Sequence, residues 1–201
     1  MRRLAPGLAL IPVPGLAQAH AFQTGADSYA LFLQGVGAPW LMLPVALLLI
    51  GTGLFLGIWR TEAMLAFWPV QIVVLALVLG LGVFVPGVPD LALVVAALAI
   101  AGLGILALPL PRAAALGLGA LALLLAGRFL LEDHAFGELP LPFMVGMAAG
   151  AASLVALPAG LVQATRERIG HPAVLIGWRA LSSWVGAAAI LMIAFALRPG
   201  A

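Results

Sequence analysis

The chain contains no cysteine, no lysine and few charged residues of any kind. Without cysteine it cannot form disulfides, thiolate metal ligands or a thiol nucleophile. Only 8% of the residues are charged and 65% are hydrophobic, which is far from the composition of a soluble globular domain. The nine basic residues are all arginines and are scattered along the chain, so no basic surface for a nucleic-acid partner is indicated.

Catalytic signatures are missing as well. There is no Gly-x-Ser-x-Gly elbow, no His-Glu-x-x-His motif and no phosphate-binding glycine loop that ends in Lys-Ser or Lys-Thr. Ser153 lies in an apolar run that contains no histidine to activate it. We therefore expect that the protein is not an enzyme.

Long apolar runs dominate the chain instead. Each is close to the roughly 20 residues that a helix needs to cross about 30 Å of hydrocarbon. The runs cover residues 40–59, 64–84, 91–110, 113–131, 141–164 and 172–197. The sequence predicts an all-α polytopic membrane protein in contact with a lipid bilayer. Its six-transmembrane-helix bundle covers residues 40–197, and residues 198–201 form a short C-terminal tail.

Residues 1–19 have the pattern of a signal peptide. Arg2 and Arg3 precede an apolar stretch over residues 4–16, and Ala17-Gln18-Ala19 is a small-x-small cleavage sequence. Cleavage would make His20 the first residue of an exported segment, residues 20–39. Three prolines interrupt the apolar stretch, so an uncleaved N-terminal segment is the alternative.

The loop charges predict an orientation. Four arginines lie in the loops after the first, third and fifth runs, and these loops are expected to be cytoplasmic. The opposite loops and the tail hold Arg198 and five acidic residues. We expect a multi-pass protein of a bacterial-type inner (cytoplasmic) membrane with both termini on the exported side. The arginines of the cytoplasmic loops are Arg60, Arg112, Arg166 and Arg168.

The expected exported face carries side chains that bind metals. Imidazole and carboxylate groups together suit borderline divalent ions such as nickel, cobalt, zinc and copper. A cleaved His20 would add its free amine as a second nitrogen ligand. The alternative is that loop acids only solvate the surface. The candidate metal ligands are His20, Asp27, Asp90, His134 and Glu138, and Glu132 and Asp133 lie beside them.

Four polar side chains within the apolar runs are candidates of another kind. Arg128 is spaced to pair with Glu132 one helical turn later, and its long side chain can extend to the membrane surface. Arg179 lies roughly 10 Å into the last run, and Ser182 and Ser183 continue its polar stripe. An intramembrane charge faces a bundle interior or a wet cavity, so functional and structural roles both remain open.

Glycine pairs spaced by four residues predict close helix packing. Gly53 and Gly57 form one pair, and Gly146 and Gly150 form another. Small residues at this spacing let two helix backbones approach each other. Such pairs are common in glycine-rich membrane chains, so we expect ordinary packing rather than a dedicated dimer site.

Three short motifs resemble the HupE/UreJ family of hydrogenase and urease accessory membrane proteins. The first follows the signal peptide and reads His20-Ala-Phe-Gln-Thr-Gly-Ala-Asp27. The others are Gly82-Val-Phe-Val-Pro-Gly-Val-Pro-Asp90 and His134-Ala-Phe-Gly-Glu138-Leu-Pro140. The resemblance implies a nickel or cobalt permease, or an accessory protein of a nickel enzyme.

The chain departs from the family pattern at imidazole positions. Asp27 is followed by Ser28 rather than by histidine, and Phe136 replaces the second histidine of the last motif. Asp90 stands where the family has glutamate. Fewer imidazoles predict weaker nickel binding.

Three functions follow from the sequence. The first is a divalent-metal permease, with nickel, cobalt or copper as its cargo and no tightly bound cofactor. The second is a non-transporting subunit or assembly factor that binds a membrane protein partner or forms a homo-oligomer. The third is an exported-side copper-binding protein that uses His20.

Overall fold

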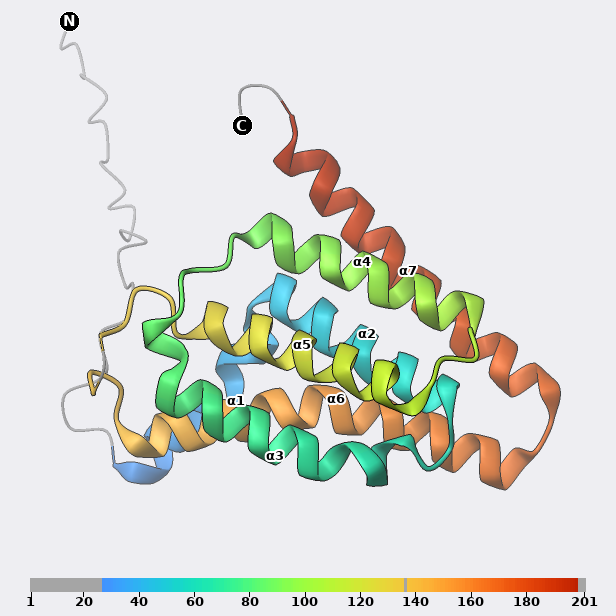
Figure 1. Cartoon of the computed structure of the whole chain (residues 1–201), viewed down its shortest axis with the longest axis horizontal. Coiled ribbons are helices and arrows are strands. Elements are labelled where there is room, and N and C mark those ends of the chain that lie inside the picture. Colours follow the sequence, from blue (N-terminus) through green and yellow to red (C-terminus); the bar gives the residue numbers. More distant parts are fainter. Residues whose placement is uncertain (1–26, 136, 199–201) are drawn as a thin grey trace, which may run out of the picture.

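In the computed structural model, residues 27–135 and 137–198 are described, and all regular elements among them are helices. The predicted signal peptide and His20 lie outside the described residues. Figure 1 shows an elongated helical bundle. The helices are α1 (Ser28–Leu41), α2 (Leu43–Trp59), α3 (Ala63–Leu81), a short 3₁₀ helix η1 (Gly82–Phe84), α4 (Asp90–Leu106), α5 (Arg112–Leu130), α6 (Leu141–Ile169) and α7 (Pro172–Ala196).

Most of these helices suit a bilayer. Among the described residues, α3, α5, α6 and α7 are long and apolar enough to cross a membrane. α1 and α2 qualify together as one broken span, bent by 81°. The apolar helix α4 has 17 residues, or about 26 Å of length. The fold is a membrane-type helical bundle, and six complete spans remain a prediction.

The first apolar run differs from its predicted form. We expected a span to begin at Trp40, whereas Trp40 lies in the last turn of α1 and the chain bends sharply at Met42 before α2 begins. Asp27 starts α1, since its Oδ1 accepts a hydrogen bond from the Ala30 N–H at 2.7 Å. Pro44 lies in the first turn of α2, where its ring prevents α1 from continuing as one helix. The predicted exported segment, residues 20–39, therefore contains helical structure over residues 28–39.

Helix α2 forms the centre of the bundle. It is buried along almost its whole length and contacts α4, α5, α6 and α7 (Figure 1). A Cβ added at Gly53 would collide with the carbonyl oxygen of Val155, and one at Gly57 would lie 2.7 Å from the Val162 side chain. This glycine pair therefore serves packing against α6 within the chain.

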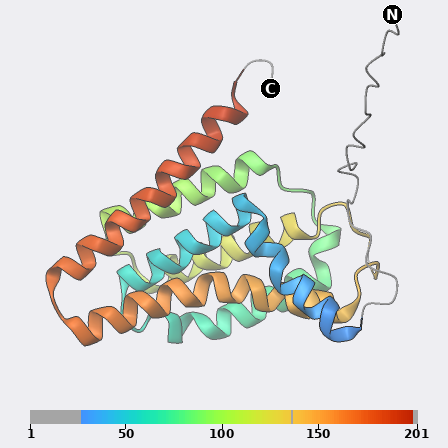
Figure 2. The same ribbon diagram turned by 180° about the vertical axis from the view of Figure 1, so that it is seen from behind.

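Helix α1 crosses α6 at equally close range, as Figure 2 shows from behind. A Cβ at Gly146 would collide with the carbonyl oxygen of Phe32, and one at Gly150 with that of Val36. From the other side, a Cβ at Gly35 would collide with the carbonyl oxygen of Phe143. The second predicted glycine pair thus joins α6 to α1, and ordinary packing is confirmed.

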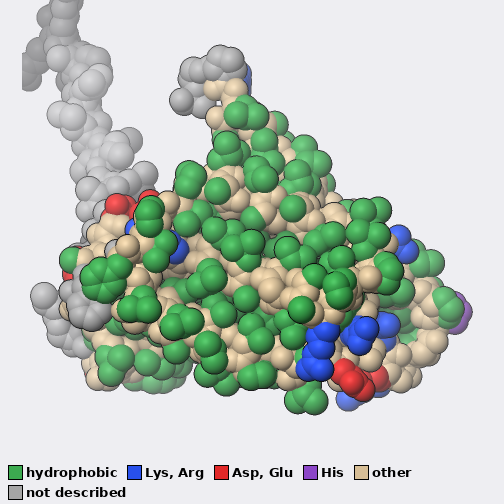
Figure 3. Space-filling model, viewed as in Figure 1, with side chains coloured by type: hydrophobic (Ala, Val, Ile, Leu, Met, Phe, Trp, Pro, Cys, Tyr) green, Lys and Arg blue, Asp and Glu red, His purple; other side chains and the backbone are tan. Residues whose placement is uncertain are grey.

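The bundle has two chemically different ends. The α2–α3, α4–α5 and α6–α7 connections lie at one end, and the α3–α4 and α5–α6 connections lie at the other (Figure 1). Basic side chains gather at the first end (Figure 3). We call these the arginine end and the acidic end. The arginine end holds Arg60, Arg112, Arg166 and Arg168, and the acidic end holds Asp27, Asp90, Glu132, Asp133 and Glu138.

Two buried polar side chains within the bundle lack partners. Both amide atoms of Gln71 in α3 and the Oγ of Ser182 in α7 have no hydrogen-bond partner among the described residues. Thr52, by contrast, donates to the Leu48 carbonyl oxygen at 2.7 Å. An unpaired polar atom that is removed from solvent costs about 1–3 kcal/mol.

Replacing Gln71 with methionine should therefore stabilise the protein by about 1 kcal/mol, because the unpaired amide is removed and the side-chain length is kept. Thermal unfolding in detergent micelles measures this effect. The control is Gln163→Met, which removes a side chain whose Nε2 donates to Glu167 at 2.9 Å. A Gln71→Met variant that is less stable than the wild type would show that the amide has a stabilising partner.

Candidate functional site

A cavity of about 470 Å³ lies at the acidic end, and ionisable side chains from two connections line it. We call it the acidic cavity. Three predicted metal ligands, Asp90, His134 and Glu138, come together there with Glu132 and Asp133. Its remaining lining residues are Met42, Pro89, Phe129 and Leu130. Asp27 is not among them, and its carboxylate caps α1 instead.

Local backbone geometry brings these groups together. Asp90 is the first residue of α4, where a carboxylate is stabilised by the positive end of the helix dipole. After α5 the chain turns sharply, with Asp133 at φ 64° and Gly137 at φ 80°, both in the left-handed region. Within that turn the Glu138 carboxylate accepts a hydrogen bond from the Ala135 N–H at 2.7 Å.

His134 is oriented by its own backbone. Its Nδ1 lies 2.8 Å from the carbonyl oxygen of Glu132. A carbonyl oxygen only accepts hydrogen bonds, so Nδ1 carries the proton in the neutral ring and the lone pair lies on Nε2. Histidines that bind metals are usually held in this way, with the other ring nitrogen donating to a carbonyl or a carboxylate.

The cavity is not a closed coordination site. Across residues 27–135 and 137–198, no three His, Asp or Glu side chains converge closely enough to hold a metal ion. A cation in the cavity would therefore keep part of its water shell. The arrangement gathers carboxylates around an open cavity at the acidic end.

Arg128 holds the connection that leads to Asp90. Its Nε donates to the carbonyl oxygens of Val85 at 2.5 Å and Pro86 at 3.2 Å. The carbonyls of this connection, rather than the Glu132 carboxylate one turn later, accept these hydrogen bonds. The arginine thus fixes the path by which the chain leaves η1 and reaches α4.

Arg179 also binds backbone. Its Nε donates to the Ile105 carbonyl oxygen at 2.6 Å, in the last turn of α4. Arg166 does the same for α2, donating to the carbonyl oxygens of Gly57 at 2.8 Å and Ile58 at 3.1 Å. The final carbonyls of a helix lack intrahelical partners, so a cation that binds them stabilises the helix end.

The two serines near Arg179 do not extend a polar path into the acidic cavity. Ser183 donates to the Ala180 carbonyl oxygen of its own helix at 2.6 Å. Ser182 is buried against α4, where a Cβ added at Gly104 would lie 2.9 Å from its Oγ. Neither serine lines the acidic cavity.

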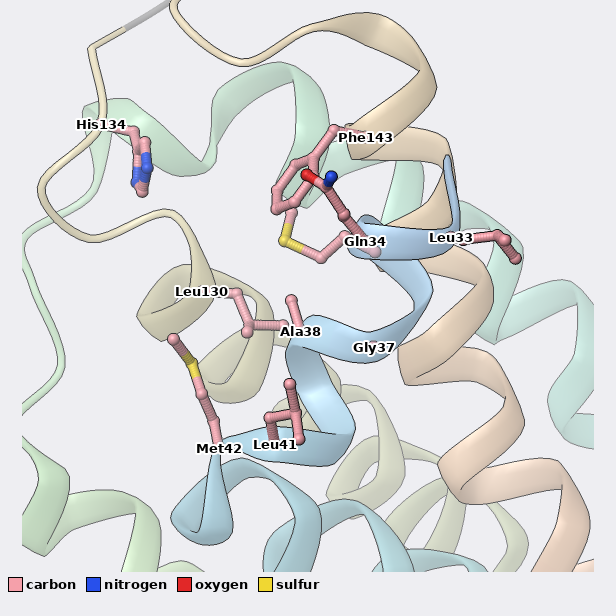
Figure 4. Close-up of a pocket in the computed structure, with 10 residues that line it drawn as sticks. Leu33, Gln34, Gly37, Ala38, Leu41, Met42, Leu130, His134 and Phe143 are labelled. Atoms are coloured by element: carbon pink, nitrogen blue, oxygen red, sulfur yellow. The ribbon is translucent and has the colours of Figure 1, made fainter. Parts of the chain in front are cut away.

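A larger pocket of about 650 Å³ adjoins the acidic cavity (Figure 4). We call it the apolar pocket. The two share Met42, Leu130 and His134. The apolar runs did not predict this pocket, although Pro39 and Pro44 bracket Met42 and indicate a broken helix. Its other lining residues are Leu33, Gln34, Gly37, Ala38, Leu41, Phe143 and Met147.

Comparison with protein-family models, with curated proteins and with solved structures finds no match. The fold and the site therefore indicate the general class of this protein and not its family. The chain is a membrane-type helical bundle with an acidic cavity at one end. The resemblance to the HupE/UreJ family remains a prediction from its short motifs.

Proposed function

We propose that the protein is a divalent-metal permease, or an accessory protein of the HupE/UreJ type, that takes nickel or cobalt through the acidic cavity. The observation that carries the proposal is the cavity lining, which includes four carboxylates and one imidazole. The proposed orientation places this cavity on the exported side of the membrane. The cavity then acts as an outer vestibule.

Charge and ligand type support this role. Carboxylates on the low-dielectric wall of a cleft raise the local concentration of cations. Among the described residues no arginine lines the cavity, and the nearby Arg128 is engaged with the carbonyl oxygens of Val85 and Pro86. Carboxylates alone also suit magnesium and calcium, whereas the imidazole of His134 adds a preference for borderline metals.

Uptake of radiolabelled nickel tests the proposal, with cobalt, zinc and copper as competitors. The variant is Asp90→Asn/Asp133→Asn, which removes two negative charges and keeps side-chain shape. Asparagine also tolerates the left-handed backbone of Asp133. We expect uptake at low metal concentration to fall at least about tenfold, because the local cation concentration falls.

The matched control is Glu62→Gln/Glu167→Gln, which makes the same charge change at the arginine end. This variant should keep wild-type uptake. Equal uptake by both variants, or no accumulation above empty cells at matched membrane levels, would overturn the permease. A partner protein that co-purifies with a non-transporting chain would favour a subunit or assembly factor instead.

A further inference from the structure

We propose that the apolar pocket binds one acyl chain of a membrane phospholipid whose ethanolamine head group lies at the acidic cavity. The proposal does not depend on metal transport. It rests on the size and lining of the pocket, on what surrounds its mouth, and on its junction with the acidic cavity.

The pocket has the character of a ligand site. Its volume of about 650 Å³ lies within the range of about 300–1,000 Å³ that is typical of small-molecule pockets. Leu41 of α1, Leu130 of α5 and Phe143 of α6 supply apolar walls (Figure 4), and Leu33 and Met147 also line the pocket. Polar side chains are few, as such sites require. Among the described residues they are Gln34 and His134.

The α1 side of the pocket carries large exposed leucines. Leu33 is 49% exposed and Leu41 is 86% exposed, and Leu43 just after the bend is 55% exposed. Large exposed leucines on a membrane-type bundle are the side chains that contact lipid tails. The 81° bend at Met42 turns α1 away from the line of α2 and leaves this space beside the bundle. We therefore expect an acyl chain to enter the pocket from the side of these leucines.

The junction with the acidic cavity selects the head group. Met42, Leu130 and His134 line both spaces, so an occupant of the pocket ends beside Asp90, Glu132, Asp133 and Glu138. The described lining of the two spaces contains four carboxylates and no arginine. An ammonium group is attracted there, whereas a head group with only negative charge is repelled. The amide of Gln34 can donate to the lipid phosphate.

Gly37 provides a way to fill the pocket. It lines the pocket, and a Cβ added there would meet no heavy atom within 4 Å. We therefore expect a leucine at this position to be accommodated without a backbone collision and to occupy space that the acyl chain would use. Gly102 in α4 also has nothing within 4 Å and lies outside the pocket lining, so Gly102→Leu is the matched control.

The experiment reconstitutes the full chain, without added metal, in bilayers of equal dioleoyl phosphatidylethanolamine and phosphatidylglycerol. Native mass spectrometry after extraction then counts the retained lipids. The wild type and Gly102→Leu should each keep one lipid per chain. Phosphatidylethanolamine should be retained up to about fivefold more often than phosphatidylglycerol, the preference expected of one partly exposed ion pair. Gly37→Leu should lose the bound lipid, while its helix content and its elution volume stay those of the wild type. Asp90→Asn/Asp133→Asn should keep a lipid without the preference.

Two results would overturn the proposal. One is equal lipid retention by Gly37→Leu and Gly102→Leu. The other is a wild type that prefers phosphatidylglycerol or shows no preference. Since the assay contains no metal and measures no transport, its failure would leave the permease untouched. A failed uptake assay would likewise leave the lipid site untouched.

Discussion

Replacing Gly146 with alanine should separate α1 from α6 and lower the free energy of unfolding by about 3 kcal/mol, the upper end of what overpacking costs. The new methyl group would collide with the carbonyl oxygen of Phe32 and approach the Val36 backbone nitrogen to 3.0 Å. Both contacts are with main-chain atoms of a helix, which cannot rotate away as a side chain can. The crossing of α1 over α6 must therefore open.

The matched control lies on the same helix. Gly160 has no heavy atom within 4 Å of an added Cβ, so Gly160→Ala should gain up to about 1 kcal/mol from helix propensity. Denaturant titration in micelles measures both variants. Hydrogen exchange in α1 identifies where Gly146→Ala acts, because only α1 should lose protection. Equal stability of the two alanine variants would contradict the close crossing.

Much of the bundle could be predicted because the ends of an apolar run mark, within a few residues, where a membrane-type helix begins and ends. The last run was predicted over residues 172–197, and the structure has α7 at Pro172–Ala196. The signals at its start are local. Proline suits the first turn of a helix, and the His171 Nδ1 accepts from the Ala173 N–H at 3.2 Å. Such boundaries need no knowledge of distant contacts.

Helix α1 could not be predicted in the same way, because what positions it is distant in the chain. Its contacts with Gly146 and Gly150 join residues more than a hundred positions apart. Hydropathy also cannot show where a run is bent, so residues 40–59 were predicted as one span. Pro39 and Pro44 were the available signal for the break at Met42.

The site was predicted in part for a similar reason. The alternation of spans and loops brings acidic loop residues to one end, and this grouping is what the structure has. The alternation does not indicate which side chains share a cavity. Asp27 became a helix cap, while Met42, which looks like an ordinary core residue, lines both spaces.

Replacing Arg128 with glutamine should lower the free energy of unfolding by about 2 kcal/mol and accelerate hydrogen exchange at Val85, whose N–H donates to the Gly82 carbonyl oxygen at 3.1 Å. The Nε of Arg128 holds the carbonyl oxygens of Val85 and Pro86 at 2.5 and 3.2 Å, and hydrogen bonds from a charged donor contribute about 1.5–3 kcal/mol. Glutamine is too short to reach both acceptors. Arg112→Gln, at the exposed start of the same helix, removes the same charge and should leave this connection protected.

Nickel uptake by Arg128→Gln distinguishes the two ways in which this arginine can act on the proposed vestibule. Were Arg128 only a positive charge near the acidic cavity, its removal would strengthen the attraction of cations and raise uptake. As an anchor of the connection that ends at Asp90, its removal displaces a carboxylate and lowers uptake. The hydrogen bonds to Val85 and Pro86 favour the anchor, so we expect uptake to fall together with protection of the connection. Higher uptake with unchanged protection would instead assign Arg128 a purely electrostatic role.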